Sequence, residues 1–489
     1  MPQPRDMPAD RIGYLGIDLG TSGLKLALVG ADGHVLAESE AAYDVTAPHP
    51  GWAETDPAAW VRALERAAKS IAPQLREPTL RGVGVTGQMH GTVLVDPAWR
   101  PVRSAVLWPD RRATAELDLW RSMPRTQRAR LANPLVPGMT GPVLAWLARN
   151  EPERLEAAAA VLLPKDYLRA VLTGHGGSDA GDRHGCTDRS DASGTLLWDM
   201  VRDDWAEGLG SVIDVDLLPV VSPADCVVGA TRWLADRAGG TPDVPVVVGC
   251  ADTAATLVAL AATQIGESAP LVVNLGTGAQ ILRPDAQVRA RVDPPSHTYA
   301  DAGRGSYVMV AVQNAGLALS WVQRLLALSW LDFVGSAAAE DGSGDVSFVP
   351  FLTGERGGLA GPSSRAAWLG LTDSTTPSQL ARAAFEAMAF SVRRAVELSG
   401  QPPRGPLLLS GGGGREPLVQ QLIADTLAAP VLRVGLRSAS AIGAAVLAAR
   451  GTGQALRIPV EPIQVEPHAS AGLERAYERW CDRLAGGDL

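Results

Sequence analysis

A strand–turn–strand pattern that occurs twice most constrains the fold of this chain. Residues 14–30 read YLGIDLGTSGLKLALVG and residues 271–282 read LVVNLGTGAQIL, so each copy joins two apolar runs through Gly-Thr and a following Gly. The threonines, Thr21 and Thr277, lie 256 positions apart (277 − 21), just over half of the 489 residues. One half of the chain therefore echoes the other, and each copy predicts a glycine-rich hairpin whose backbone N–H groups can face an anion.

Length and composition indicate a multidomain globular protein. A chain of 489 residues is too long for one compact core, so two or more domains are expected. The apolar share of 46% and the charged share of 20% are ordinary for a soluble enzyme. The net charge of −9 argues against a nucleic-acid partner, but a local backbone nest can still bind an anionic small molecule.

Targeting and covalent signals are weak. The four cysteines are far apart and form no CxxC pair, which favours reduced thiols over disulfides or a structural zinc site. The first residues carry no apolar signal-peptide segment, and no uncharged apolar stretch is long enough to span a bilayer. We therefore expect a cytoplasmic protein with no membrane partner.

The expected elements divide the chain into two α/β halves. After the first hairpin we expect a strand from Val35, a helix over residues 60–71 capped by Asp56 and Pro57, and a strand–turn–strand over residues 82–96. Helical patterns dominate residues 113–170, residues 173–194 predict a polar loop, and an apolar strand at 244–250 runs into a helix. We place the domain boundary after that helix, which gives domains of residues 1–264 and 265–489. The second half adds helices near residues 315–328, 383–398 and 417–427.

The first hairpin has the residue types of a phosphate site. Gly20, Thr21 and Ser22 let a backbone approach a phosphate, and the two hydroxyls can donate to it. Asp18 would repel phosphate directly, so it suits a hydrated Mg²⁺ that bridges the phosphates. A plain hairpin that carries an Asp is the alternative for one copy, but two matching copies favour a nucleotide cleft between related domains.

Two further glycine motifs differ in what they predict. Gly411, Gly412, Gly413 and Gly414 lie between a strand and a helix, a position typical of ligand sites in α/β sheets, although a flexible loop would read the same. The GVGVTG match at residues 82–87 is followed by a strand pattern, so it does not predict a dinucleotide site. The chain has no P-loop motif.

Asp252 is the candidate general base. It follows an apolar strand and begins a helix, where it could accept a proton from an alcohol or, alternatively, merely cap the helix. Met89 and His90 lie in a turn between strands, where a lone His is most often structural. Trp108, beside Pro109-Asp110-Arg111, offers an indole face to a polyhydroxy ligand or anchors a core.

These motifs together resemble the FGGY family of carbohydrate kinases, within the actin-like ATPase superfamily, over nearly the whole chain. GIDLGTSGLK (16–25), PHPGWAETDP (48–57), TGQMHG (86–91), LLPKDYLR (162–169), TDRSDASGTLLWD (187–199) and FLTGERGG (351–358) appear in the order that its xylulokinases show. The resemblance implies an α/β fold of two actin-like ATPase (ribonuclease H-like) domains with an interdomain cleft. It further implies sugar binding and the base in residues 1–264, and nucleotide binding in residues 265–489.

The resemblance also implies roles for individual residues. Asp252 would deprotonate the sugar, and Asp18 and Asp252 would hold Mg²⁺, with water between. The other implied ligand contacts are Met89, His90, Trp108, Asp252 and Thr253 for the sugar, and Gly20, Thr21, Ser22, Gly276, Thr277, Gly411, Gly412, Gly413 and Gly414 for ATP. Thr253 stands where xylulokinases carry Asn, Val143 stands where Lys is common, and the GER segment lacks the usual Thr-Pro-His.

We therefore expect an ATP-dependent kinase that converts D-xylulose to D-xylulose 5-phosphate, either alone or as a homodimer. One alternative keeps the family and changes the substrate to another ketose, a pentitol or gluconate. Another alternative, from a different class, is a non-catalytic actin-like ATP-binding module.

Overall fold

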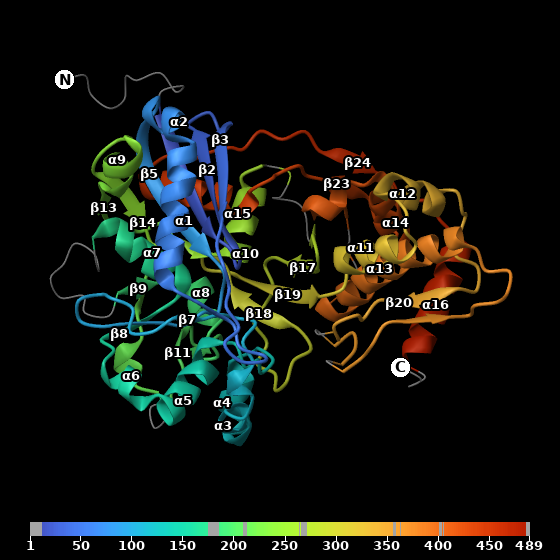
Figure 1. Ribbon diagram of the computed structural model, residues 1–489, viewed down its shortest axis with the longest axis horizontal. Helices are drawn as coiled ribbons and strands as arrows, with labels where there is room; N and C mark the ends of the chain where they lie inside the picture. The colour runs from blue at the N-terminus through green and yellow to red at the C-terminus, as the bar shows by residue number, and fades with distance from the viewer. Residues whose placement is uncertain are drawn as a thin grey trace.

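The protein forms two α/β bodies that lie side by side along its longest axis (Figure 1). The computed structural model describes residues 12–174, 185–208, 213–263, 265, 271–355, 358–361, 363–400, 403 and 405–485. The predicted boundary at Gln264 and residues 175–184 of the predicted polar loop lie outside the described residues. The mixed α/β architecture confirms the predicted fold class.

The first body is built on a seven-stranded sheet in the order β13-β14-β5-β1-β2-β3, with β15 continuing beside β5. Strands β1, β2 and β3 are antiparallel, whereas β5 and β14 run parallel to β1 and to each other. The bounds are β1 Ile12–Leu19, β2 Gly23–Gly30, β3 Val35–Ala42, β5 Thr79–Gly87, β13 Val227–Thr231, β14 Val244–Val247 and β15 Cys250–Ala251.

The second body repeats this topology. Its sheet runs β18-β19-β17-β16-β22-β23-β24, with β16, β17 and β19 antiparallel and β16, β22 and β23 parallel. The bounds are β16 Val272–Leu275, β17 Ala279–Arg283, β18 His297–Ala300, β19 Ser306–Val312, β22 Leu407–Ser410, β23 Val431–Arg433 and β24 Ile463–Val465. Three antiparallel strands followed by two parallel ones therefore occur twice, which confirms the echo seen in the sequence.

Short strand pairs lie outside the two sheets. They are β4 Glu54–Thr55 with β7 Ala105–Val106, β6 Val93–Val95 with β8 Ala160–Leu162, β9 Cys186–Thr187 with β12 Val220–Val221, β10 Trp198–Asp199 with β11 Asp204–Trp205, and β20 Ser347–Val349 with β21 Ala367–Leu369.

The helices begin and end at signals in the sequence. Helix α1 starts at Pro57 because the Asp56 carboxylate accepts from the N–H of Ala58 at 2.9 Å. Helix α13 starts six residues before the predicted 383, since Thr376 and Gln379 form a capping box. The helices are α1 Pro57–Ser70, α2 Ala72–Arg76, α3 Leu117–Ser122, α4 Arg125–Arg130, α5 Thr140–Asn150, α6 Pro152–Glu156, α7 Pro164–Thr173, α8 Arg189–Ser193, α9 Trp233–Ala238, α10 Asp252–Ala261, α11 Gly316–Leu325, α12 Trp330–Ala338, α13 Pro377–Ser399, α14 Pro417–Leu427, α15 Ala439–Gly451 and α16 Ala471–Ala485.

Helix α15 crosses from the second half of the chain to the first sheet. In Figure 1 it lies among the blue strands of the first body although it belongs to the red end of the chain. Added Cβ atoms at Gly16 and Gly84 would lie only 1.7 Å from the carbonyl oxygen of Ala441 and 2.0 Å from that of Ala444. The glycines of β1 and β5 thus let the helix backbone rest on the sheet, which gives the GVGVTG segment a packing role.

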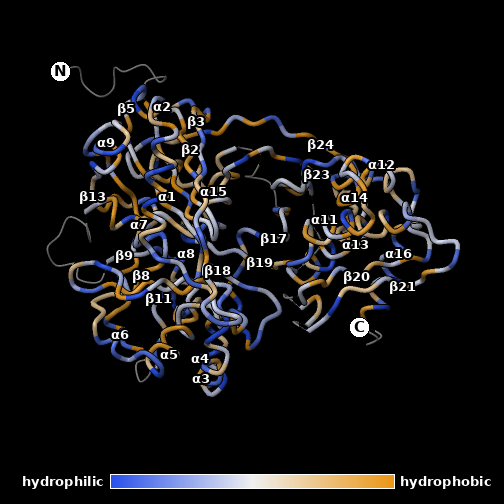
Figure 2. Tube along the Cα trace, viewed as in Figure 1, coloured by the Kyte–Doolittle hydropathy of each residue, from blue (hydrophilic) through white to orange (hydrophobic). Residues whose placement is uncertain are grey.

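The two faces of the first sheet have different covers. Leu15 and Ile17 alternate with Gly16 along β1 and pack in one core with Trp60 of α1. The opposite core contains residues of α10 and α15. Figure 2 shows apolar segments concentrated inside both bodies. The first sheet is therefore a layer between helices from both halves of the chain.

Across the residues that the structure describes, no single helix combines the length and apolar character needed to cross a membrane. Helices α11 and α12 meet that test of length and composition only as a pair, and they are bent by 98°.

Candidate active site

The carboxyl ends of three neighbouring strands bring the first group of predicted residues together. Asp18 of β1 is in register with Thr86 of β5, and Ala251 of β15 is in register with Gly87. Asp252 follows directly as the first residue of α10. Asp18, the turn after β1, the turn after β5 and Asp252 therefore share one edge of the first sheet, where α/β proteins place their ligands.

Asp18 and Asp252 form an electrostatically unusual pair. The Oδ1 atom of Asp18 is buried and has no hydrogen-bond partner among the described residues. Burial raises the pKa of Asp18 to about 7, and the charge of Asp252 adds to the rise. Burial also raises the pKa of Asp252 to about 6, against hydrogen bonds from Thr253. Two carboxylates that repel each other in this way fit a divalent cation that would neutralise both.

Thr253 orients the Asp252 carboxylate through two hydrogen bonds. The Oδ1 atom of Asp252 accepts from the N–H of Thr253 at 2.6 Å and from its hydroxyl at 3.2 Å. Ala251, not Asp252, occupies the N-cap position of α10. The carboxylate is thus held by its neighbour at the start of the helix, and the Thr253 side chain is buried beside it.

A buried ion network supports the segment that leads into Asp252. Lys165 of α7 lies 2.6 Å from Asp166, 3.3 Å from Asp188 and 3.2 Å from Asp191, all nearly inaccessible to solvent. Burial alone would lower the pKa of Lys165, but the three carboxylates outweigh it and raise the pKa. Such a network is costly to break, because removing one partner leaves an uncompensated buried charge.

Three hydrogen bonds connect this network and its surroundings to the backbone before Asp252. The hydroxyl of Ser190 accepts from the N–H of Ala251 at 2.9 Å, and Arg169 donates to the carbonyl of Val248 at 3.0 Å. Thr86 donates to the carbonyl of Cys250 at 2.6 Å. The LLPKDYLR and TDRSDASGTLLWD motifs, to which the sequence assigned no role, therefore fix the position of the candidate base.

The predicted sugar-side residues lie next to the first hairpin. His90 has a positive φ of 71°, its Nδ1 atom bonds the carbonyl of Gly194, and its own carbonyl accepts from Thr140 at 3.0 Å. A Cβ at Gly194 would lie 2.8 Å from the Cε atom of Met89. Met89 and His90 are therefore packed in fixed positions by the segment that follows α8.

Trp108 connects the sugar side to the phosphate turn. Its Nε1 atom donates to the Thr21 hydroxyl at 2.8 Å, and the ring is only partly buried, so it is not a core anchor. Gln88 donates to the carbonyl of Gly20 at 3.3 Å, and Ser22 is exposed at the tip of the turn. The first group of predicted residues therefore lies in one place.

The second group lies at the matching edge of the second sheet. Gly276 and Thr277 form the exposed turn between β16 and β17, and Leu317 at the start of α11 donates its N–H to the Thr277 carbonyl at 2.8 Å. Gly411 has a φ of 88°, and a Cβ there would lie 2.3 Å from the carbonyl oxygen of Leu275. The two glycine segments therefore touch through the end of β16.

The four successive glycines have different surroundings. Gly413 and Gly414 face leucine side chains closely, at 2.9 Å from an added Cβ in both cases. An added Cβ at Gly412 would meet nothing within 4 Å. Gly412, Gly413 and Gly414 belong to a short 3₁₀ helix, Gly412–Arg415, and Gly411 is its N-cap. Of the four glycines, Gly412 alone opens onto free space.

Sequence reasoning missed two aromatic residues beside the site. His297 and Tyr299 come from β18 of the second body, and their rings are stacked with centroids 5.2 Å apart. The Tyr299 ring also lies 5.9 Å from the His90 ring of the first body. Strand alternation could have shown that His297 and Tyr299 share a face, but no local pattern says which body that face meets.

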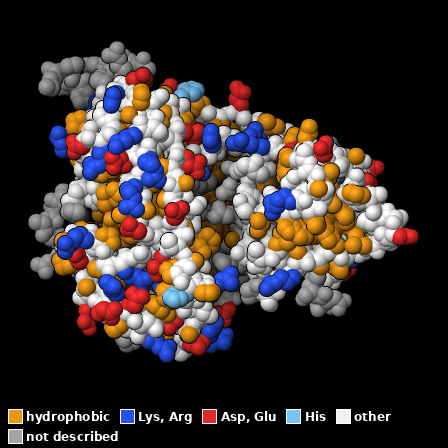
Figure 3. Space-filling view, viewed as in Figure 1, with side chains coloured by type: hydrophobic (Ala, Val, Ile, Leu, Met, Phe, Trp, Pro, Cys, Tyr) orange, Lys and Arg blue, Asp and Glu red, His pale blue; other side chains and the backbone are white. Residues whose placement is uncertain are grey.

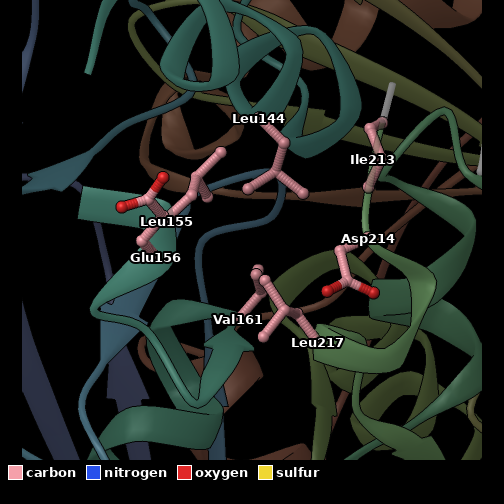
Figure 4. A pocket seen from close by; sticks show the side chains of 7 residues that line it. All are labelled: Leu144, Leu155, Glu156, Val161, Ile213, Asp214 and Leu217. Carbon is pink, nitrogen blue, oxygen red and sulfur yellow. The ribbon is translucent and has the colours of Figure 1, made fainter. Parts of the chain in front are cut away.

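Two cavities in the described part of the chain lie apart from the predicted site residues. An apolar cavity of about 200 Å³ in the first body is lined by Leu144, Leu155, Glu156, Val161, Ile213, Asp214 and Leu217 (Figure 4). A cavity of about 1050 Å³ runs from the segment at residues 218–225 to Arg450 and the β18–β19 turn. Neither is lined by a predicted site residue.

The surface of the two bodies also differs. Figure 3 shows charged side chains of both signs over the first body and apolar side chains gathered on the second. Leu325, Trp330 and Leu331 of α11 and α12 are among the exposed large apolar residues. None of them is a predicted site residue.

Comparisons with known proteins agree with this geometry. The model of the FGGY family of carbohydrate kinases matches with its N-terminal domain over residues 13–259 and with its C-terminal domain over residues 271–452. This chain belongs to the FGGY family of carbohydrate kinases. The family assignment and the enzyme class predicted from the sequence are thereby confirmed, and ATP is the phosphoryl donor that sugar kinases of this family use.

Individual relatives show how far the similarity extends. The chain is 32% identical over 444 residues to the xylulose kinase of Escherichia coli (strain K12), which covers 89% of each chain. The crystal structure of a xyloylose kinase from Brucella ovis matches with a TM-score of 0.85 and 29% identity, covering 97% of this FGGY kinase and 98% of that chain. A gluconate kinase from Lactobacillus acidophilus matches with a TM-score of 0.87 at 20% identity, covering 97% and 99%, and supports the fold alone.

Proposed function

We propose that this FGGY kinase transfers the γ-phosphoryl group of ATP to the terminal hydroxyl of D-xylulose, giving D-xylulose 5-phosphate. The observation that carries the proposal is the Asp18–Asp252 pair at the strand ends of the first sheet, between the sugar-side residues and the Gly-Thr turn. Similarity to xylulose kinases over most of the chain supports this sugar.

Asp252 is placed to act as the general base. Its carboxylate accepts the proton of the sugar hydroxyl as that oxygen attacks the γ-phosphorus, and the bond from phosphorus to the β–γ bridging oxygen breaks. ADP leaves with the electron pair of that bond. Thr253 holds Oδ1 of the base from the side, and the network around Lys165 fixes its backbone.

Mg²⁺ fits the donor set of the site. The unpartnered, buried Oδ1 of Asp18 and the carboxylate of Asp252 are oxygen ligands of the kind that a hydrated magnesium ion prefers. We propose that both hold the ion through water. When bound, it would neutralise phosphate charge and favour the ionised form of the two carboxylates.

The two Gly-Thr turns would contact the phosphates from opposite sides. Gly20, Thr21 and Ser22 would do so from the first body, and Gly276 and Thr277 from the second. The adenosine would lie over Gly411, Gly412, Gly413 and Gly414, where Gly412 leaves open space. Closure of the two bodies on both substrates would exclude water from the transfer. The division into residues 1–264 and 265–489 stays a prediction.

The alternative to D-xylulose is another substrate of the same kinase reaction. Thr253 stands where xylulokinases carry Asn, and its hydroxyl, which donates to Asp252, would contact the sugar as an acceptor in place of an amide. Another ketose, a pentitol or gluconate is the alternative. Membership of a kinase family and an intact base position weigh against a non-catalytic ATP-binding module.

The base assignment is tested with Asp252→Ala, measured as ketose-dependent ADP release. We expect a loss of at least about 100-fold in kcat, because general-base catalysis contributes about 10²–10⁴-fold. The matched control is Asp332→Asn, which changes another aspartate in the first turn of a helix, at an exposed position. Near-normal turnover of Asp252→Ala would refute the assignment.

The substrate is tested with a panel of D-xylulose, D-ribulose, L-ribulose, xylitol, ribitol and gluconate, each assayed for ADP release. The highest kcat/KM is expected with D-xylulose. A much higher value for another compound would transfer the proposal to that substrate while leaving the kinase reaction intact.

Three further expectations concern the location, the partners and the oligomeric state of the protein. Cytoplasmic location and the absence of a nucleic-acid partner remain proposals that rest on composition. A homodimer is likewise a prediction, which sedimentation equilibrium would test.

A further inference from the structure

Strand β18 of the second body is anchored directly onto the first body. The side chain of Asn133 donates to the carbonyl of Thr298 at 2.9 Å and accepts from its N–H at 3.1 Å. The hydroxyl of Ser193 accepts from the N–H of Ala300 at 3.0 Å. Asn133 and Ser193 are buried, so these bonds fix the residue between the two anchors, Tyr299, against the first body.

The Tyr299 side chain extends into the neighbourhood of the candidate sugar site. Its ring lies 5.9 Å from that of His90, 5.2 Å from that of His297 and 5.8 Å from that of Tyr307. Tyr299 itself has no solvent exposure, at 0%. A residue of the second body therefore forms part of the wall around His90.

The hydroxyl of Tyr299 has no partner among the residues that the structure describes. Leaving a buried hydroxyl unpaired costs about 1–3 kcal/mol, and a ligand group that paired with the Tyr299 hydroxyl would recover that cost. Burial raises the pKa of Tyr299, and the charge of Asp252 raises it further, as it also does for the neighbouring Tyr307. The ring contact with His90 is therefore what distinguishes Tyr299 from Tyr307.

The chemistry of a phenol suits a polyol. Its hydroxyl can donate one hydrogen bond and accept others, as a sugar hydroxyl does. The hydroxyl of Thr253 donates to Asp252, so toward a sugar it can act as an acceptor. The Tyr299 hydroxyl, unpartnered among the described residues, is free to donate and would complement it.

Building on the proposed sugar-kinase function, we propose that Tyr299 is a specificity-determining residue of the sugar site, whose hydroxyl forms a hydrogen bond with one hydroxyl of the bound sugar. The second body then contributes to sugar binding as well as to nucleotide binding. Because β18 is anchored by Asn133 and Ser193, that contribution depends on the contact between the two bodies.

The first test is Tyr299→Phe in the full chain, with D-xylulose and ATP varied separately. We expect the KM for the sugar to rise about 3- to 10-fold, as for the loss of one hydrogen bond, and the KM for ATP to stay within about twofold. The melting temperature should be unchanged or higher, since the substitution removes an unpaired buried hydroxyl. A lower melting temperature together with an unchanged sugar KM would assign Tyr299 to packing and overturn the proposal.

Tyr307→Phe is the matched control. Tyr307 is also fully buried on the neighbouring strand, and its hydroxyl is also unpartnered among the described residues. Among the described residues, the Tyr307 ring contacts that of Tyr299 but not that of His90. We therefore expect Tyr307→Phe to keep a sugar KM within about twofold of the parent. Equal changes in both variants would show a general packing effect and contradict the proposal.

A second test identifies the partner hydroxyl. Wild type and Tyr299→Phe are compared with 1-deoxy-, 3-deoxy- and 4-deoxy-D-xylulose. The analogue that lacks the partner hydroxyl should bind the wild type more weakly but lose nothing more in the variant, because both changes remove the same bond. Additive losses with all three analogues would overturn the proposal.

These measurements separate the two proposals. If the wild type does not phosphorylate D-xylulose, the proposed substrate is wrong, and the same variants are compared with the sugar that the panel does support. If the wild type is active and Tyr299→Phe has the parent sugar KM, only the assignment of Tyr299 is wrong.

Discussion

The two Gly-Thr hairpins share a backbone topology but differ in what their strands carry. Asp18 of β1 and Asn274 of β16 are separated by the same 256 positions as the two threonines (274 − 18). Asp18 is opposite Thr86 and has an unpartnered buried oxygen, whereas Asn274 is opposite Ser410 and its amide donates to Gln280 at 3.1 Å. One copy therefore carries a carboxyl group with an unpartnered oxygen, and the other carries an amide whose N–H group is paired.

The turn after β5 and the turn after β22 also differ in the side chains that they carry. In the first body β5 leads into Gln88, Met89 and His90: the Gln88 side chain bonds the hairpin at Gly20, and the other two pack against Gly194. In the second body β22 leads into four glycines that leave the backbone bare. The repeated topology thus presents polar side chains in the first body and bare backbone in the second. This difference fits the proposal that the first body binds the sugar and the second binds the nucleotide.

Among changes that test the comparison of the two hairpins, the largest effect is expected from making the first copy resemble the second. Asp18→Asn should lower Mg²⁺-dependent turnover by about 10- to 100-fold, as for loss of a group that holds a metal through water. Titration of activity with Mg²⁺ checks this. The reciprocal variant Asn274→Asp should stay within about fivefold of the parent. Equal losses in both variants would mean that the two copies are not specialised.

The pH dependence tests the charge on the first copy. The base is active when ionised, so kcat/KM should fall about tenfold per unit as the pH drops below about 6, the raised pKa of Asp252 in the free enzyme. Higher Mg²⁺ should move this limb to lower pH, because a cation favours the ionised carboxylates. A flat profile from pH 5 to 8 would contradict the role of Asp252.

The open surface of the second copy predicts a smaller and more selective effect. Gly412→Ala should raise the KM for ATP about 3- to 10-fold by narrowing the space for a ligand, with no change in melting temperature. Gly405 is the control, since an added Cβ there also meets nothing within 4 Å, and it lies before β22, away from the turn. Equal behaviour of the two variants would place the nucleotide elsewhere.

The smallest expected effect is on stability. In the absence of ligands, the raised pKa of Asp18 means that its contribution to the free energy of unfolding is present below about pH 4 and lost as the pH rises through about 7. Asp18→Asn should therefore raise the melting temperature by about 2 °C or more at pH 8 and leave it nearly unchanged at pH 4. An equal shift at both values would argue against a charged Asp18 in the folded protein.

Local signals in the sequence were sufficient for much of this structure. The Gly-Thr motifs predicted both hairpins, and Pro57 predicted the start of α1. Helix α14 covers the predicted residues 417–427. Such features depend on residues close together in the chain, where turn and capping preferences act. Asp18, Met89, His90 and Asp252 lie at one edge because the parallel strands β1, β5 and β15 end together, and Trp108 joins them through its bond to Thr21.

Longer-range features were not accessible in the same way. Helical periodicity identifies an apolar face of α15 but not the sheet that this face covers, and only Gly16, Gly82 and Gly84 hint that a backbone passes over β1 and β5. The approach of Tyr299 to His90 likewise depends on anchors 165 positions apart in the chain, Asn133 and Thr298. Contacts of this kind come from the packing of the two bodies.

The position of α15 affects how the protein is synthesised. The first sheet begins at Ile12, but the helix that covers one of its faces begins only at Ala439, 427 residues later (439 − 12). At about 5–20 residues per second, the ribosome needs roughly 20 to 85 seconds to produce that interval. During this time the glycine-lined face of β1 and β5 lacks its cover by α15, so it stays exposed to solvent or to provisional contacts until translation is nearly complete.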